Sequence, residues 1–168
     1  IQLHHPNFSD ENESKFIIGD TTEIFKILRN IPEIIQINQR TLVNGMLSTP
    51  TGTTGVQVFG IDTATEFSYS SLKQKIKEGN DLASYKRNQV IIGKKIADKM
   101  KLKIGSKLVL MFNDTTNNLV SSAFRVSSIY QSTNAPVDER LIYVSGSELS
   151  ELLGLPGQIH EIGLKLND

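Results

Sequence analysis

The sequence predicts an α+β fold, in which β-strands dominate and short helices cover or connect them. Three observations favour this class. Residues 33–46 and 56–61 alternate polar and apolar side chains around a turn-rich segment, as in a hairpin of two long strands. Residues 21–30 carry apolar side chains at helical spacing. Residues 90–110 combine a β-branched strand, a glycine, a two-turn helix, a turn at Gly105 and a second strand.

The first half of the chain is expected to hold one strand end, one amphipathic helix and the hairpin. Residues 1–3 alternate like the end of a strand. Asp20 has the position of a helix N-cap, with Glu23 reaching back in a capping box, and Pro32 ends the helix. Gly45 lies inside the first long strand and predicts a bulge or bend there.

The second half is expected to continue as strands joined by polar turns and short helices. The run Asn113–Asn118 is polar and tolerates left-handed conformations, so it predicts a hairpin loop between strands 108–112 and 119–130. The remaining expected elements are a helical or irregular segment at 66–77, a loop at 131–138, a strand at 141–144, a helix at 148–153 with Ser147 as N-cap, and a strand at 158–166.

Length and composition suit one globular domain, or two small subdomains that share a chain. The chain has 168 residues, of which 38% are hydrophobic and 21% charged. It has no cysteine, which excludes disulfides and thiolate metal sites. The longest apolar run, residues 108–112, is far shorter than the ~18 residues of a membrane span. The chain begins inside one expected strand and stops just after another, so we expect it to be part of a longer protein.

Charge is unevenly distributed, although the net charge is zero. Residues 73–107 hold eleven Lys or Arg against three acidic residues, a local charge of +8. One interpretation is a basic face for an anionic partner such as nucleic acid, lipid headgroups or an acidic protein. The other is an ordinary solvated surface, which the absence of interleaved aromatic residues favours. A binding module that uses residues 73–107 therefore stays open as an alternative function.

No motif in the sequence indicates an enzyme, a cofactor site or a metal site. A Walker loop, a nucleophile elbow and a His-Glu-x-x-His motif are all missing. His4 and His5 are adjacent, so on an extended chain they point in opposite directions. Asp62-Thr63 matches only two letters of the aspartic protease motif. The carboxylates of Asp138-Glu139 and Asp10-Glu11 fall in expected loops, where we expect them to be solvated. A small hydrolase is the least favoured reading.

Four stretches, taken in order, resemble one family. They are residues 1–8 (IQLHHPNF), 56–62 (VQVFGID), 90–110 (VIIGKKIADKMKLKIGSKLVL), and 124–138 with 141–155. Together they resemble the extracytoplasmic core domain of MacB-, LolC/LolE- and FtsX-like ABC transporter permeases. Ser106 replaces the aspartate that the family usually has, and the loop Asn113–Asn118 is shorter than the hook with which LolC-like members bind their chaperone.

The resemblance implies a two-part fold and a mechanical role. A porter-like α/β subdomain would comprise residues 1–65 and 131–168, and a β-rich sabre-like subdomain, residues 66–130, would be inserted between them. The domain would be non-catalytic and would lie in the periplasm at the inner membrane. It would pass ATP-driven movement to a periplasmic substrate such as a lipoprotein.

The partners implied are a cytoplasmic ATPase subunit, a second permease copy and a lipoprotein or other periplasmic partner, with no nucleic acid. Flanking helices of the longer protein would provide the membrane attachment. The candidate partner contacts are Asn113, Asp114, Thr115, Thr116, Asn117 and Asn118. The turn 49–55 and the basic residues 94–107 are further candidate surfaces.

Overall fold

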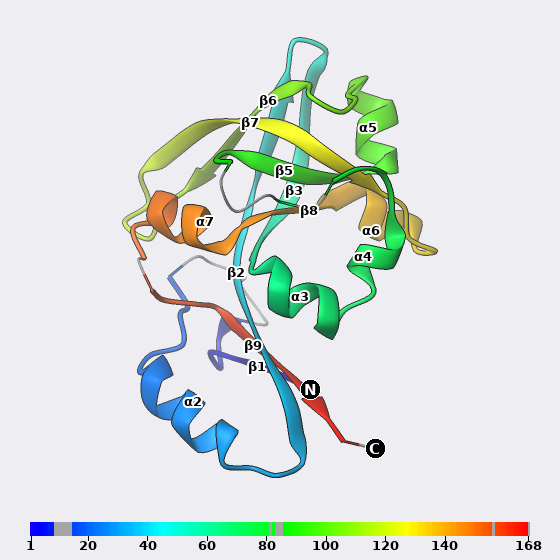
Figure 1. Cartoon of the computed structure of the whole chain (residues 1–168). Coiled ribbons are helices and arrows are strands. Elements are labelled where there is room, and N and C mark those ends of the chain that lie inside the picture. Colours follow the sequence, from blue (N-terminus) through cyan, green and yellow to red (C-terminus); the bar gives the residue numbers. More distant parts are fainter. Residues whose placement is uncertain (9–14, 81, 83–85, 156, 168) are drawn as a thin grey trace.

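The computed structural model describes residues 1–8, 15–80, 82, 86–155 and 157–167. It is a mixed fold of long strands and short helices (Figure 1). The elements are β1 (Gln2–His4), α2 (Thr21–Arg29), β2 (Ile34–Thr49), β3 (Gly52–Ile61), α3 (Thr63–Tyr69), α4 (Leu72–Lys75), β4 (Ile76–Gly79), β5 (Gln89–Gly93), α5 (Lys94–Met100), β6 (Lys107–Asn113), β7 (Leu119–Tyr130), α6 (Ala135–Arg140), β8 (Leu141–Ser145), α7 (Gly146–Leu153) and β9 (Glu161–Leu166).

Six of the strands close into a barrel. β2 pairs with β3, β3 with β8, β8 with β5, β5 with β7, β7 with β6, and β6 returns to β2. The β3–β8 and β5–β7 pairs are parallel, whereas the other four are antiparallel. Closure leaves these strands with few free edges, while β4 adds a short strand beside β7.

β2 joins the barrel to a second, smaller sheet. Residues 34–40 of β2 pair with β9, and β9 pairs with β1. Residues 40–49 pair with β3 inside the barrel. The strand is 16 residues long, or roughly 50 Å, which is enough to run through both parts. Figure 1 shows β2 passing from the small sheet, where both chain ends lie, up into the barrel.

His160 closes the gap where β2 changes partners. One edge of β2 carries β9 up to Arg40 and β6 from Met46 onward. Between them, the backbone N–H of Leu42 donates to the ring Nδ1 of His160 at 3.0 Å. The backbone N–H of His160 in turn donates to the carbonyl of Arg40. A buried N–H without an acceptor would be costly, so the fully buried imidazole takes the place of a ladder bond.

Most buried apolar side chains of the described residues form three clusters. The largest fills the barrel and continues under α5 and α7; it includes Leu47, Val58, Ile92, Leu110, Phe124 and Ile142. A second lies between α2 and the small sheet and centres on Leu28, Ile162 and Leu164. A third, around Ile91, Tyr130 and Tyr143, lies on the outer side of β5, β7 and β8. The small sheet is thus packed by α2 on one face, and α3 packs on its other face.

Most of the elements predicted from the sequence are confirmed. The helix at Thr21–Arg29 begins with Asp20, whose carboxylate accepts the N–H of Glu23. The hairpin of β2 and β3 forms with a tight turn at residues 50–51. Residues 89–113 follow the predicted order of strand, glycine, short helix, turn and strand.

Two local predictions are wrong, and a third, the bulge or bend at Gly45, is wrong as to the bulge. Gly45 makes no bulge, since the β2–β3 register runs through it without a shift. Instead a Cβ there would lie 2.5 Å from the carbonyl oxygen of Met111, so glycine allows β6 to approach β2. Residues 135–140, within the predicted loop 131–138 and just beyond it, form α6, because Pro136 fits the first turn of a helix. The N-cap of α7 is Ser145, not Ser147.

The barrel contains strands from both parts of the predicted two-subdomain division. β2, β3 and β8 belong to the segments 1–65 and 131–168, whereas β5, β6 and β7 belong to 66–130. The division at residues 65 and 131 stays a prediction. None of the helices in the described part of the chain is long and apolar enough to cross a membrane.

Candidate functional site

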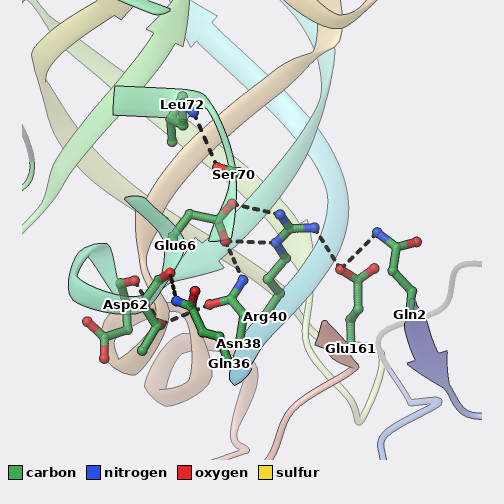
Figure 2. Close-up of polar contacts among 10 residues, drawn as sticks. Gln2, Gln36, Asn38, Arg40, Asp62, Glu66, Ser70, Leu72 and Glu161 are labelled. Atoms are coloured by element: carbon green, nitrogen blue, oxygen red, sulfur yellow. Dashed lines mark hydrogen bonds and ion pairs between the residues drawn. The ribbon is translucent and has the colours of Figure 1, made fainter. Parts of the chain in front are cut away.

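A buried polar network lies at the junction of the small sheet and the barrel. We call it the junction network; its members are His4, Asn38, Arg40, Glu66 and Glu161. Figure 2 shows the contacts that join Asn38, Arg40, Glu66 and Glu161. They come from β1, β2, α3 and β9, so four elements meet through these side chains. Arg40 and Glu66 are 8% and 1% exposed, which places their charges in the protein interior.

Arg40 and Glu66 form a two-pronged ion pair. Nη2 of Arg40 donates to Oε1 of Glu66 at 2.6 Å, and Nε donates to Oε2 at 2.9 Å. Asn38 donates a further hydrogen bond from Nδ2 to Oε2 of Glu66 at 2.6 Å. The planar guanidinium matches the carboxylate, so the pair fixes α3 against β2 in one orientation.

Glu161 extends the network to the other two strands. Nη1 of Arg40 donates to Oε1 of Glu161 at 2.7 Å. The second oxygen, Oε2, lies 2.9 Å from Nε2 of His4 on β1. Gln2 also donates to Glu161, at 3.5 Å. One arginine therefore holds two carboxylates from distant parts of the chain, and β1, β9 and β2 are tied together by side chains as well as by their backbones.

Aromatic rings enclose Arg40. Its guanidinium carbon lies 5.5 Å from the ring centre of Phe59 and 5.3 Å from that of Tyr69. Gly163 makes room for Tyr69, because a Cβ at residue 163 would lie 2.7 Å from the tyrosine ring. These contacts exclude water from the ion pairs and restrict the rotamers of Arg40.

The charges of the network set the protonation of its members. Burial by itself would raise the pKa of Glu66, but the hydrogen bonds and positive charge of Arg40 outweigh burial and hold that pKa below its ordinary value. For Arg40, burial would lower the pKa, yet the two carboxylates outweigh it and raise the pKa above the ordinary value. Both groups are therefore charged at neutral pH.

Acid should weaken the protein through Glu66. Because the folded-state pKa lies below the ordinary value of 4.5, the unfolded chain binds the proton first as pH falls. The stabilisation is fully present above pH 4.5 and is lost as pH falls toward the lower folded pKa. We expect the free energy of unfolding of Glu66→Gln, measured by urea titration between pH 7 and pH 3, to be lower at neutral pH and to approach that of the parent in acid. Parallel curves for the two proteins would contradict this role.

A cleft lies beside the network, between the starts of α3 and α7. It encloses about 800 Å³ and is lined by polar side chains, among them Asp62, Thr63, Ser145 and Glu148, and by the apolar side chains of Ile61, Leu82 and Ile159. Asp62 caps α3 by accepting the N–H of Ala64. Glu148 accepts the N–H of Asn88 through both carboxylate oxygens. The described lining residues include no histidine and no aromatic side chain, so they offer neither an imidazole base nor a stacking platform.

The predicted contact residues Asn113–Asn118 form a compact turn. Oδ1 of Asp114 accepts the N–H groups of Thr116 and Asn118 and the hydroxyl of Thr116. The hydrogen bond from the Asn118 backbone is the main cause that holds the pKa of Asp114 below its ordinary value. Thr115 donates its N–H and its hydroxyl to the carbonyl of Leu153. The turn is thus attached to the end of α7, and its role in binding stays a prediction.

Several other residues considered in the sequence analysis have structural partners. Asp138 is 2% exposed and both of its oxygens accept the N–H of Ser132, so the prediction that it is solvated was wrong. Glu139 is exposed, as expected, and Asp10-Glu11 lie outside the described residues. Within residues 73–107, Arg87 pairs with Glu148 and Glu151, and Lys94 pairs with Asp98. Among the described residues, no group of three or more His, Cys, Asp or Glu could hold a metal ion.

The junction network was not anticipated from the sequence. Arg40 lies in a segment predicted to be a strand, where a charged residue normally marks a solvent-facing position. The available signal was the pattern of Asn38, Arg40 and Leu42 on one strand face, in which both polar residues precede the apolar pair Leu42-Val43. That pattern does not reveal which residues pair with Arg40.

Sequence comparison identifies no relative: no family model matches the chain, and neither does any curated protein. Comparison with solved structures identifies proteins of similar fold. The extracellular domain of the noncanonic ABC-type transporter YknZ from Gram-positive bacteria superposes with a TM-score of 0.67 at 12% identity, over 99% of this chain and 82% of that one. The periplasmic region of MacB from Actinobacillus actinomycetemcomitans gives a TM-score of 0.67 at 16% identity, over 99% and 73%.

This chain has the MacB periplasmic-domain fold. The similarity extends over nearly all of its residues, so the barrel, the small sheet and the helices between them are all part of the shared architecture. The resemblance inferred from the four sequence stretches is confirmed at the level of the fold, as is the α+β class. The TM-scores establish the fold, whereas identities of 12% and 16% carry no residue-level assignment of function.

Proposed function

We propose that the chain is the non-catalytic extracytoplasmic domain of an ABC transporter permease. The observation that carries this proposal is the match of 99% of the chain to two extracytoplasmic domains of such transporters. In the full-length protein, membrane segments would anchor the domain, and a cytoplasmic ATPase would drive them, with a second permease copy alongside. In a diderm cell the domain would lie in the periplasm at the inner membrane, and its cargo would be a lipoprotein or another periplasmic substrate.

The domain would act by moving as a stiff body. Both chain ends lie at the small sheet (Figure 1), and the barrel extends from the other end of β2. The junction network ties these two parts together through Arg40, with Glu66 on α3 and Glu161 on β9. Movement applied at the small sheet would therefore reach the barrel without loss in a flexible joint.

Accessibility labelling of a single cysteine tests the location. This chain has no native cysteine, so Thr51→Cys, at the exposed turn between β2 and β3, is the one label site within it, and the permease without this substitution gives the background. In cells that express the full-length permease, we expect a membrane-impermeant maleimide to label Thr51→Cys before lysis. A cysteine in the nucleotide-binding partner is the matched control and should react only after lysis. Labelling of Thr51→Cys only in lysed cells would contradict the proposal.

A further inference from the structure

We propose that the outer face of β2, β6 and β7 is a docking surface for a partner protein that presents an acidic group beside an apolar segment. We call this surface the outer β-face. Its outward positions are Asn44, Met46 and Ser48 in β2, Lys107, Val109, Met111 and Asn113 in β6, and Leu119, Ser121, Ala123 and Arg125 in β7. The inference goes beyond the proposed function, because it concerns a surface of this chain wherever the chain is located.

The strand register places these side chains together. Met46 lies opposite Met111, and Val109 lies opposite both Ser48 and Ala123. Residues directly opposite in antiparallel strands share a face, with Cβ atoms about 5 Å apart. The alternate residues of β6, such as Leu110, point into the barrel and are buried. The outward row is therefore continuous across three strands.

The centre of the outer β-face is exposed and uncharged. Val109 and Met46 are 37% and 45% exposed, and Leu119, at the loop end of the face, is 71% exposed. No aspartate or glutamate occupies any of the outward positions. A sheet face open to water normally carries polar or charged side chains, whereas five of these eleven outward positions are Met, Val, Ala or Leu.

One end of the face is basic and lacks a counter-charge. Lys107 lies directly opposite Arg125, and like charges in this arrangement repel. Neither side chain forms an ion pair with any described residue, while Nη1 of Arg125 donates to the carbonyl of Gly105 at 3.0 Å. Lys103 and Ile104 lie in the turn that leads into β6, and Ile104 is 42% exposed. An acidic group from a partner would relieve this repulsion.

Charge complementarity selects the occupant. A second copy of the chain would bring the same basic end and no carboxylate on its own outer β-face, so it supplies no counter-charge. An acidic, apolar segment supplies both the charge for Lys107 and Arg125 and the cover for Val109 and Met46. β6 is hydrogen-bonded to β7 along its length and to β2 at 109–111, so such a segment would bind through side chains rather than by adding a strand.

A synthetic probe tests the surface with the purified chain. The probe is a fluorescein-labelled extended peptide with three glutamates followed by alternating valine and serine. Its two controls replace the glutamates with lysines, or the valines with serines. We expect anisotropy to report binding of the first peptide only, and to report weaker binding as salt is raised. Equal binding of the lysine peptide, or no binding of any peptide, would overturn the proposal.

Charge-reversed variants locate the binding. Lys107→Glu with Arg125→Glu should weaken binding about tenfold or more. Lys26→Glu with Arg29→Glu, on the exposed side of α2, makes the same change of charge elsewhere and should leave binding intact. If the first pair fails to fold, a dye on Met46→Cys in the otherwise native chain should still respond to the acidic peptide. Binding retained by the Lys107/Arg125 variant, or a dimer in sedimentation that Val109→Asp dissociates, would contradict the proposal.

Discussion

Replacing Arg40 with leucine should destabilise the protein by about 3–5 kcal/mol. The substitution leaves the carboxylates of Glu66 and Glu161 buried without their shared cation, and both are less than 5% exposed. It also opens the space between the rings of Phe59 and Tyr69. For a chain of this size the loss corresponds to a fall in Tm of roughly 10 °C. Thermal unfolding followed by circular dichroism measures it.

Two controls separate the buried network from ordinary surface charge. Arg87→Leu also removes an arginine that pairs with two carboxylates, but its side chain is 71% exposed, so we expect little change in Tm. Neutralising Glu66 and Glu161 to glutamine in the Arg40→Leu background should recover part of the loss, since the uncompensated charges disappear. If Arg40→Leu behaves like Arg87→Leu, the junction network does not stabilise the fold.

Gly93→Ala should destabilise the protein by about 3 kcal/mol. A Cβ at residue 93 would lie 2.2 Å from the carbonyl oxygen of Asp138 and 2.8 Å from its carbonyl carbon. These are backbone atoms of α6, so a side chain cannot turn away to make room, and the helix must shift. Gly93 is the glycine that the sequence places between β5 and α5, and the structure shows that it accommodates α6. Urea unfolding of the variant measures the cost.

Gly19→Ala is the matched control. Nothing lies within 4 Å of a Cβ at residue 19, so the same added methyl group meets open space and should not destabilise the protein. A loss for Gly93→Ala no larger than that for Gly19→Ala would mean that α6 tolerates displacement from β5.

The elements that the sequence predicts are those with local signals. The capping box at Asp20 and the apolar spacing after it define α2, and the strand, glycine and helix pattern at 90–100 defines β5 and α5. α6 was missed because it has only six residues, and Pro136 suits a loop as well as a first helical turn. Barrel closure depends on β6 reaching β2 some 60 residues earlier, and no local pattern encodes that pairing.

The candidate site could not be predicted for a related reason. Arg40 pairs with residues that are 26 and 121 positions away along the chain. A single charged residue in a strand indicates a solvent-exposed position until its buried partners are known. No sequence motif around Glu66 marks it as the buried partner of Arg40. The outer β-face likewise depends on the register of β2, β6 and β7. The hairpin loop at 113–118 was predicted correctly as a turn because asparagine, aspartate and threonine favour turns locally.

The central claim, that this domain transmits movement as a stiff body, is tested most directly by distance measurements in the full-length permease with its ATPase. Spin labels at Glu33→Cys, beside the small sheet, and Thr51→Cys, at the end of the barrel hairpin, report one distance within a copy. A single Thr51→Cys label per copy reports the distance between two copies. We predict that the first distance is the same with and without ATP, while the second changes by more than the width of its distribution. A change in the distance within one copy, with the distance between copies constant, would contradict the account.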